Sequence, residues 1–162
     1  AGQFDLALGA ATKFVAIEPG EADALNARCW VKALQPDPTA ALSDCDKAIL
    51  ANPSHFQALD SRAFVYWQLG RDQEAQADIA AAQKLDPGFW DWSKRVERFP
   101  IIMARRYLKS LNYYLGPIDG DFDDLGPTQK AVADYQRKAG IVDDGKVTPD
   151  LISRLRQEAT KS

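Results

Sequence analysis

A period of 34 residues in the first half of the chain constrains the possible folds more than any other sequence feature. Pro19, Pro53 and Pro87 are separated by this interval. The same interval relates further small, charged and apolar positions, namely Ala7/Ala41/Ala75, Phe14/Ala48/Ala82, Arg28/Arg62 and Val31/Val65. A chain with such a period builds one supersecondary unit repeatedly, and each copy buries its apolar face against the next copy.

Each copy of the repeat contains two segments with helical spacing. The apolar positions and the flanking prolines predict first helices over 22–34 and 56–69 and second helices over 38–51 and 72–84. Gly70 is expected to end the helix over 56–69, because glycine readily adopts the left-handed conformation that follows a helix. Residues 2–17 match only a second helix, so we expect further repeats upstream of this sequence.

The period and the small-residue positions resemble the tetratricopeptide repeat (TPR) family. The resemblance implies an all-α solenoid of helical hairpins with a concave surface that binds a protein or peptide partner. It assigns residues 1–99 to the repeat region, with a half repeat over 1–19, repeats over 22–53 and 56–87, and a junction helix over about 88–99. The alternative is an unrelated all-helical bundle in which the prolines recur by coincidence.

The TPR resemblance places the partner-binding groove on the first helix of each repeat. The groove positions are Asp23, Asn26, Trp30, Gln57, Asp60, Phe64 and Trp67. The three aromatic side chains are expected to be exposed and to anchor the partner, unless another part of the molecule covers them. Asp23 and Gln57 replace the basic and asparagine residues that clamp a partner's terminal carboxylate in some repeats, which disfavours a chaperone-tail adaptor.

Cys29 and Cys45 are the two cysteines of the chain. In the packing that the TPR resemblance implies, they face each other across one hairpin, close enough for a disulfide. The alternative is a pair of small buried thiols, a role that free cysteine also fills. A disulfide would indicate an oxidising compartment, because reducing conditions in the cytosol keep thiols free.

The repeat pattern stops at Pro100, and the charge changes near this point. The formal net charge is −6 over residues 1–92 and +3 over residues 93–162. Helical spacing then predicts three helices, over 101–115, from Pro127 to Gly140, and from Pro149 onward. Thr148 is expected to cap the third of these helices. We therefore assign residues 100–162 to a second domain.

Residues 101–155 resemble the three-helix peptidoglycan-binding domain that is often attached to cell-wall hydrolases. The segments that carry the resemblance are 108–114, 116–122, Pro127-Thr128, Ala131-Val132, Tyr135-Gln136, Gly140-Ile141, Asp144-Gly145 and Val147-Thr148-Pro149 with Leu151. The resemblance implies wall binding, with candidate ligand contacts at Tyr114, Asp121, Thr128 and Arg137. Wall binding requires an open cleft beside Asp121 and Thr128.

Two details of this resemblance bear on the cleft. Asp123, Asp124 and Leu125 lengthen the stretch before Pro127, where the family usually moves directly to Gly-Pro, and this insertion borders the expected cleft. Gln136 is expected to hydrogen-bond a neighbouring loop and to have a structural role.

The composition excludes several classes of function. The 20 basic and 23 acidic residues give a formal net charge of −3, which argues against a nucleic-acid-binding protein. No apolar run approaches the ~20 residues of a membrane-spanning helix. One histidine and two cysteines do not supply the usual ligands of a zinc site, so we expect no metal and no cofactor.

Two other possible sites, a calcium loop and a catalytic histidine, lack residues that such sites require. Asp119, Asp121, Asp123 and Asp124 resemble a calcium loop, but the glycine and the acid that an EF-hand needs at positions 6 and 12 are missing. His55 precedes a predicted helix and has no nucleophile beside it in the sequence, so we expect a solvated or capping histidine and no catalytic base.

These observations predict a non-catalytic scaffold of the bacterial periplasm or cell envelope. Its repeats would recruit a protein partner, and its second domain would bind peptidoglycan. One alternative is the non-catalytic tail of a larger cell-wall hydrolase or protease whose catalytic domain lies upstream. Another is a cytoplasmic TPR scaffold in which the three-helix domain only docks onto the repeats.

Overall fold

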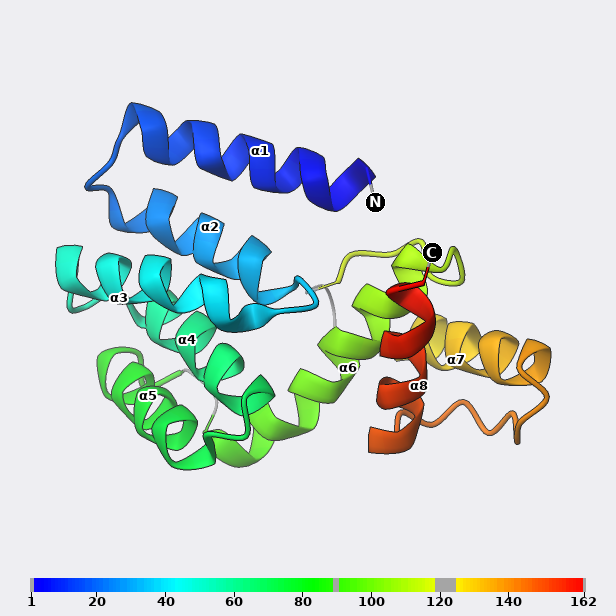
Figure 1. The fold of residues 1–162 in the computed structure, drawn as a ribbon. Coiled ribbons are helices and arrows are strands. Elements are labelled where there is room, and N and C mark those ends of the chain that lie inside the picture. Colours follow the sequence, from blue (N-terminus) through cyan, green and yellow to red (C-terminus); the bar gives the residue numbers. More distant parts are fainter. Residues whose placement is uncertain (1, 89–90, 119–124, 162) are drawn as a thin grey trace. The chain divides into compact units, whose positions relative to one another are not determined.

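A computed structural model of the chain describes residues 2–88, 91–118 and 125–161 (Figure 1). Within these ranges the structure contains α-helices and one short 3-10 helix and no β-strand, so the all-α prediction is confirmed for them. The contacts divide the chain into two compact units, Ala1–Lys94 and Arg95–Ser162, which are described separately below. None of the helices described is long and apolar enough to cross a lipid bilayer.

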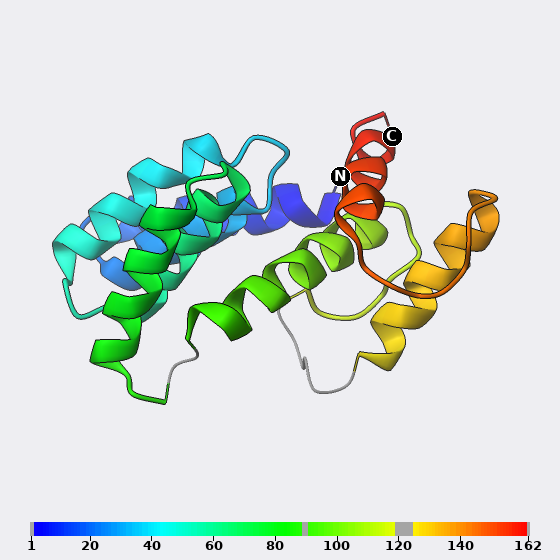
Figure 2. The ribbon, with the colours of Figure 1, turned by 90° about the horizontal axis from the view of Figure 1, so that it is seen from below.

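Unit 1 is a succession of packed helices. Its elements are α1 (Gly2–Ile17), α2 (Ala22–Ala33), the 3-10 helix η1 (Pro38–Ala41), α3 (Leu42–Ala51), α4 (Phe56–Gln68) and α5 (Asp72–Leu85). Helix α2 packs against α1 and α3, and α4 packs against α5. Helix α4 also contacts α2 and α3, so consecutive hairpins stack on one another, as Figures 1 and 2 show.

The second helix of the first complete repeat begins differently from the prediction over 38–51. Residues Pro38–Ala41 form a 3-10 turn, and the α-helix starts at Leu42. The Asp37 carboxylate accepts a hydrogen bond of 2.9 Å from the Thr39 backbone N–H, and Pro38 occupies the first turn, where it needs no hydrogen-bond partner. A tight first turn is a common way to satisfy the free N–H groups of a helix start.

Small side chains form the contact surfaces between the helices of unit 1. A buried cluster joins Ala24, Ala48 and Ala58 with Val15 and Leu25. The repeat-related Ala41, Ala75 and Ala82 are fully buried as well. Alanine at these points lets the helix backbones approach closely, which explains why the 34-residue period preserves small residues there. Helix α1 lacks this coverage, since its Phe14 remains 40% exposed.

An arginine–aspartate pair links the two helices of each hairpin. Arg28 donates two hydrogen bonds, of 2.8 and 2.6 Å, to the Asp44 carboxylate, and Arg62 donates two of 2.7 Å to Asp78. The two pairs are related by the same 34-residue interval that relates the prolines. Both aspartates are buried, so these charges depend on their arginine partners.

The Asp44 carboxylate also accepts a hydrogen bond of 2.7 Å from Lys32. Burial opposes its ionisation, but the hydrogen bonds from Arg28 and Lys32 outweigh this effect and lower the pKa of Asp44. Asp44 therefore remains charged in the folded protein at neutral pH.

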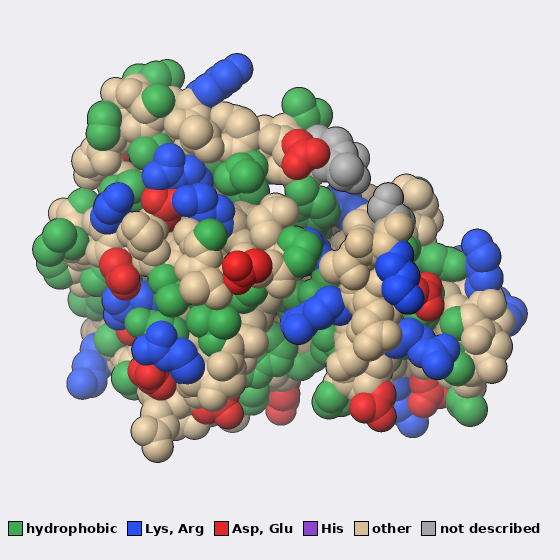
Figure 3. Space-filling view, viewed as in Figure 1, with side chains coloured by type: hydrophobic (Ala, Val, Ile, Leu, Met, Phe, Trp, Pro, Cys, Tyr) green, Lys and Arg blue, Asp and Glu red, His purple; other side chains and the backbone are tan. Residues whose placement is uncertain are grey.

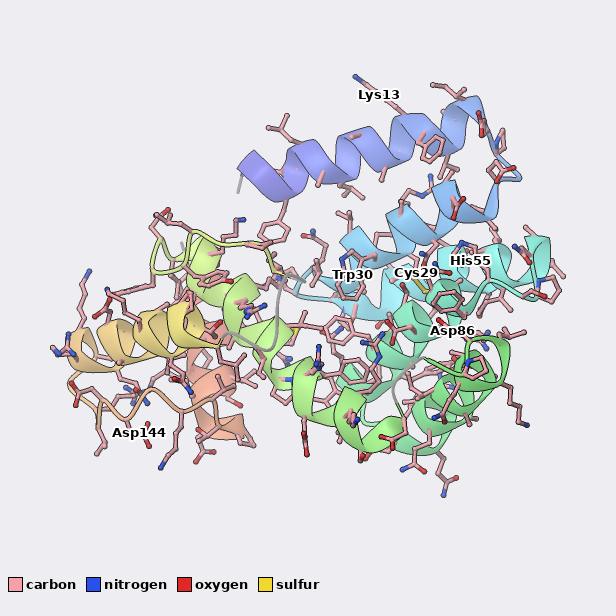
Figure 4. The ribbon with its side chains drawn as sticks, turned by 180° about the vertical axis from the view of Figure 1, so that it is seen from behind. Lys13, Cys29, Trp30, His55, Asp86 and Asp144 are labelled. Carbon is pink, nitrogen blue, oxygen red and sulfur yellow. A yellow bond between two sulfur atoms is a disulfide. The ribbon has the colours of Figure 1, made fainter. Side chains whose placement is uncertain are left out.

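A disulfide joins Cys29 on α2 to Cys45 on α3, with 5.3 Å between their Cα atoms. Figure 4 shows Cys29 within unit 1. The pairing predicted from the TPR resemblance is thus confirmed, and the alternative of two free thiols is not what the structure contains. The same hairpin therefore carries a covalent link and an ion-pair link between its helices.

Unit 2 is built from α6 (Trp92–Ser110), which begins in the last residues of unit 1, α7 (Gly126–Lys138) and α8 (Pro149–Ala159). All three helices contribute buried apolar side chains, namely Ile102, Met103, Tyr107, Leu108, Ala131, Val132, Tyr135, Leu151 and Leu155. Thr148 caps α8 by accepting a hydrogen bond of 3.2 Å from the Leu151 backbone N–H, as predicted. The segment after α7 runs back along that helix before α8 begins (Figure 2).

The predicted break between a junction helix over 88–99 and a helix over 101–115 is wrong. Helix α6 passes without interruption through Pro100. A proline inside a helix costs about 3 kcal/mol, because it removes one backbone donor and crowds the preceding turn. The buried side chains of Phe99, Ile102 and Met103 on both sides of Pro100 offset that cost.

Helix α6 also ends five residues before the predicted end at 115. Asn112 takes the left-handed conformation, with φ at 63°, which asparagine tolerates better than most residues. The backbone N–H groups of Asn112 and Tyr113 then bond to the carbonyls of Lys109 and Leu108, which closes the helix. Leu115, at the predicted end of this helix, is 89% exposed.

Replacing Asp44 by asparagine is expected to destabilise unit 1 by about 2 kcal/mol, because the buried side chain would lose the charge that strengthens its hydrogen bonds from Arg28 and Lys32. Since the pKa of Asp44 is lowered by folding, its contribution exists above the ordinary aspartate pKa of about 3.9 and is lost as the pH falls below it. The D44N variant should therefore lose part of the acid sensitivity of the wild type. Urea unfolding followed by circular dichroism between pH 2 and 7 measures both effects.

Asp46 provides the matched control, since its side chain is 57% exposed and accepts one hydrogen bond from Arg62. Asp46→Asn should cost less than about 1 kcal/mol. Equal costs for the two asparagine variants would contradict the role assigned to Asp44.

Reduction of the Cys29–Cys45 disulfide is expected to lower the free energy of unfolding by about 3 kcal/mol, from the chain entropy that a loop of this size restricts. Urea unfolding with and without a reductant measures the change. A variant with both cysteines replaced by alanine should not respond to the reductant. Alkylation of the native protein by iodoacetamide before any reduction would show that the thiols are free and would contradict the disulfide.

Candidate functional site

Unit 2 contains a cavity of about 540 Å³ at the start of α7. Three segments line it: the first half of α6, the start of α7, and the segment that precedes α8. The lining residues are Glu97, Pro100, Ile101, Leu125, Thr128, Gln129 and 144–148. The space beside Thr128 is therefore open, as wall binding requires.

One side of the cavity is formed by residues 144–148, and Gln136 holds this segment against α7. The Gln136 side chain donates a hydrogen bond of 3.0 Å to the Asp144 carboxylate and accepts one of 2.9 Å from the Gly145 backbone N–H. Gly145 has φ at 67°, and a Cβ atom there would lie 3.1 Å from the backbone oxygen of Gln129. Only glycine fits this position easily. The predicted hydrogen bonding between Gln136 and a neighbouring loop is confirmed.

Among the lining residues that the structure describes, the charged groups are two acids and one base. Hydrogen bonds from the Lys146 backbone N–H and from the Gln136 side chain lower the pKa of Asp144, so this carboxylate is ionised at neutral pH. Its other oxygen lies 3.6 Å from the Lys146 ammonium. Glu97 adds a further carboxylate to the lining. The remaining surface is largely apolar, so the cavity combines apolar contacts with hydrogen-bond acceptors.

Two of the predicted ligand contacts are largely buried. Tyr114 is 5% exposed, and its hydroxyl donates a hydrogen bond of 3.1 Å to the Pro117 carbonyl. Thr128 is 2% exposed, and its hydroxyl accepts a hydrogen bond of 2.8 Å from the Arg105 guanidinium. The same guanidinium lies 5.6 Å from the centre of the Tyr114 ring. Arg105 thus holds both side chains toward the interior, and Thr128 lines the cavity whereas Tyr114 does not.

Sequence reasoning missed Arg105, the residue that brings Tyr114 and Thr128 together. Arginine is usually exposed, so an arginine among apolar residues of a helix gives no signal that it is 1% exposed. The one sequence feature that could have indicated its burial is its position directly after Ala104, on the apolar side of α6.

Arg137 does not line the cavity. Arg137 is exposed and pairs with Asp134 at 3.2 Å and Asp143 at 3.1 Å. It is nine residues from Thr128 on the same helix, which is about 14 Å along the axis. Asp121 lies outside the described residues, as do the other aspartates of the possible calcium loop. Of the four predicted contacts, the structure places Thr128 at the cavity.

The predicted groove of unit 1 contains an aromatic cluster from α2 and α4. The Trp30 and Phe64 ring centres are 5.3 Å apart, and the Phe64 and Trp67 centres are 6.0 Å apart. Trp30 and Trp67 are half-buried, whereas Phe64 is fully buried. The expectation that Phe64 is an exposed anchor is therefore wrong, since its ring packs between the two indoles.

The polar residues of the predicted groove differ in their contacts and in their exposure. Asp23 lies 2.9 Å from His55 Nε2, while His55 Nδ1 accepts a hydrogen bond of 3.2 Å from the Ala58 backbone N–H. His55 thus caps α4, which is one of the two roles expected for it. Gln57 is exposed, and Asn26 and Asp60 are half-buried. In the part of the chain that the structure describes, no group of three or more metal-ligating side chains comes together.

Replacing Thr128 by valine is expected to destabilise the protein by about 2 kcal/mol, because the buried Arg105 guanidinium loses the oxygen that accepts its hydrogen bond. Thr128→Ser keeps the hydroxyl and should lose less than half as much. Thermal and urea unfolding measure both variants. Equal stability of the valine variant and the wild type would show that this hydrogen bond does not hold α6 and α7 together.

Comparison with known proteins supports the second resemblance. Residues 100–155 match the family model of a putative peptidoglycan binding domain. The match covers 56 of the 162 residues and lies within unit 2. Neither a curated protein nor a solved structure matches the chain significantly. The peptidoglycan-binding resemblance read from the sequence is thus confirmed for the segment that builds the cavity beside Thr128.

Proposed function

We propose that unit 2 binds peptidoglycan at the cavity beside Thr128, and that the chain serves as a non-catalytic scaffold of the bacterial envelope. The observation that carries this proposal is that the cavity and the family match fall on the same segment of the chain. All residues that line the cavity, except Glu97, fall within the segment that matches the peptidoglycan-binding family model. A family resemblance and an open cavity thus point to the same side chains.

The size and lining of the cavity suit a sugar-containing polymer. Ligand pockets commonly measure about 300–1,000 Å³, and this cavity falls within that range. Apolar side chains such as Ile101 and Val147 can contact the carbon faces of sugar rings. The carboxylates of Glu97 and Asp144 can accept hydrogen bonds from hydroxyl and N-acetyl groups. Because acids outnumber bases here, we assign neutral glycan groups to this cavity in preference to the carboxylates of a stem peptide.

We further propose that α1 to α5 form a TPR array that recruits a protein partner. Support comes from the 34-residue period, the stacking of consecutive hairpins and the recurrence of the Arg28–Asp44 pair as Arg62–Asp78. The half-buried indoles of Trp30 and Trp67 would contact the partner. Asn26 would contribute as well, because its side-chain oxygen is buried without a hydrogen-bond partner among the described residues.

We place the protein in the periplasm or another oxidising part of the envelope. The Cys29–Cys45 disulfide supports this location, because disulfides are rare in the reducing cytosol. A binding role, as opposed to a catalytic one, is supported by the use of the one histidine, His55, as a helix cap. A wall-bound scaffold and the tail of a wall hydrolase would share this binding site.

Sedimentation with purified sacculi tests the proposed site. The wild-type chain should pellet with sacculi, and Gln129→Trp should weaken binding about tenfold or more, since a bulky side chain at this exposed lining position would occupy the cavity. Gln157→Trp is the matched control, because Gln157 is exposed on α8 and does not line the cavity. Circular dichroism verifies that both variants are folded.

Two outcomes would contradict the proposal. If the wild-type protein stays in the supernatant, the proposed wall binding is contradicted. The alternative of a domain that only docks onto the repeats is then favoured. Equal pelleting of Gln129→Trp and the wild type would show that the wall binds elsewhere on the molecule.

A further inference from the structure

Unit 2 contains a second cavity, of about 340 Å³, at the opposite end of α7 from the first. Its lining comes from the turn after α6, the end of α7 and the end of α8: Leu111, Tyr113, Tyr135, Lys138, Ala139 and Glu158. Lys138 follows Thr128 by ten residues, which is about 15 Å along the helix. Leu111, Tyr113 and Tyr135 fall in segments that carry the peptidoglycan-binding resemblance, but none of the lining residues was a predicted ligand contact.

The aromatic part of this cavity is held in a defined geometry. Asn112 closes α6 in the left-handed conformation, and Tyr113 follows it directly. The Tyr113 ring meets the Tyr135 ring edge to face, with 5.5 Å between centres. The Tyr135 hydroxyl donates a hydrogen bond of 2.9 Å to one oxygen of the Glu158 carboxylate. Burial, together with this hydrogen bond, raises the pKa of Tyr135, so the phenol remains a donor.

Two opposite charges in the lining, both on exposed side chains, have no charged partner among the described residues. Lys138 lies 5.7 Å from the centre of the Tyr113 ring, and its ammonium forms no ion pair or hydrogen bond with the described residues. Glu158 uses one oxygen to accept the Tyr135 hydrogen bond and forms no ion pair with the residues described. By contrast, Lys130 and Arg137 on the same helix pair with Asp134.

The combination of these groups selects a small zwitterion. A carboxylate bound to Lys138 and an ammonium bound to Glu158 would satisfy both charges, and a short aliphatic stem would lie against Tyr113 and Leu111. The volume is near the lower end for ligand pockets, which suits one amino-acid residue better than a disaccharide. A neutral sugar would displace water from both charged groups without offering either of them an ionic partner.

We propose that the cavity formed by Tyr113, Lys138 and Glu158 binds the zwitterionic end of an unlinked peptidoglycan stem peptide. The inference rests on the proposed function of unit 2 and extends it. The cavity beside Thr128, with its excess of acids, would take neutral glycan groups, and this second cavity would take the charged end of the peptide. One wall fragment could then contact both ends of α7.

Nuclear magnetic resonance of the ¹⁵N-labelled full chain tests the proposal, with meso-diaminopimelic acid as the probe. The probe should shift the amide signals of Leu111, Tyr113 and Ala139. Lys138→Gln and Glu158→Gln should each weaken binding about tenfold, whereas Lys138→Arg should retain it. Lys130→Gln is the control, because Lys130 is exposed on α7 outside the cavity. Pimelic acid and cadaverine, which lack the amines or the carboxylates, should bind more weakly than the probe.

Several results would overturn the inference. The absence of shifts at the cavity in a wild-type chain that pellets with sacculi would overturn it and leave wall binding intact. Equal affinity of Lys138→Gln and the wild type for the probe would also overturn it. If the glutamine variants lose the probe but bind a purified stem peptide as the wild type does, the cavity takes a free amino acid and the wall-peptide assignment fails. Probe binding without sacculus binding would instead contradict the proposed function.

Discussion

Arginine side chains that bond across a pair of helices are the interaction on which both units depend. In unit 1, Arg28 and Arg62 each bind a buried aspartate through two hydrogen bonds. In unit 2, the fully buried Arg105 reaches from α6 to Thr128 on α7. A guanidinium that has left water needs its acceptors in a defined geometry, so such contacts restrict how two helices can pair. They therefore set the packing that alanine contacts alone would leave less specific.

The cavities of unit 2 follow from this fixed pairing and from the turns at the ends of α7. Gly145 allows the segment before α8 to approach α7 and close one side of the first cavity. At the other end, Asn112 stops α6 and directs the chain into Tyr113, which lines the second cavity. Gly140 ends α7 with the same double hydrogen-bond pattern that Asn112 uses for α6. Turn residues thus shape both cavities, and the helices hold those turns in place.

The errors of sequence reasoning at particular residues have a common cause. Pro100 signals a helix end, yet α6 continues because the side chains around it are buried. Tyr114 and Thr128 are polar enough to suggest ligand contacts, yet Arg105 draws both inside. In each case the local signal was outweighed by burial against another helix. The second cavity was not predicted, because its shape depends on how the turn after α6 packs against the ends of α7 and α8, and none of its lining residues was a predicted ligand contact.

The sequence by itself determined the all-α class, the helical hairpins with their 34-residue period, and the peptidoglycan-binding resemblance over residues 101–155. These features depend on spacing, small residues and turn chemistry, which are local and can be read along the chain. The pairing of Cys29 with Cys45 was also within reach, because the repeat resemblance places the two cysteines on facing helices. Only the tertiary structure decided which polar side chains are buried and which charges lie open at a cavity. Burial depends on contacts between elements distant in sequence, and no local pattern records them.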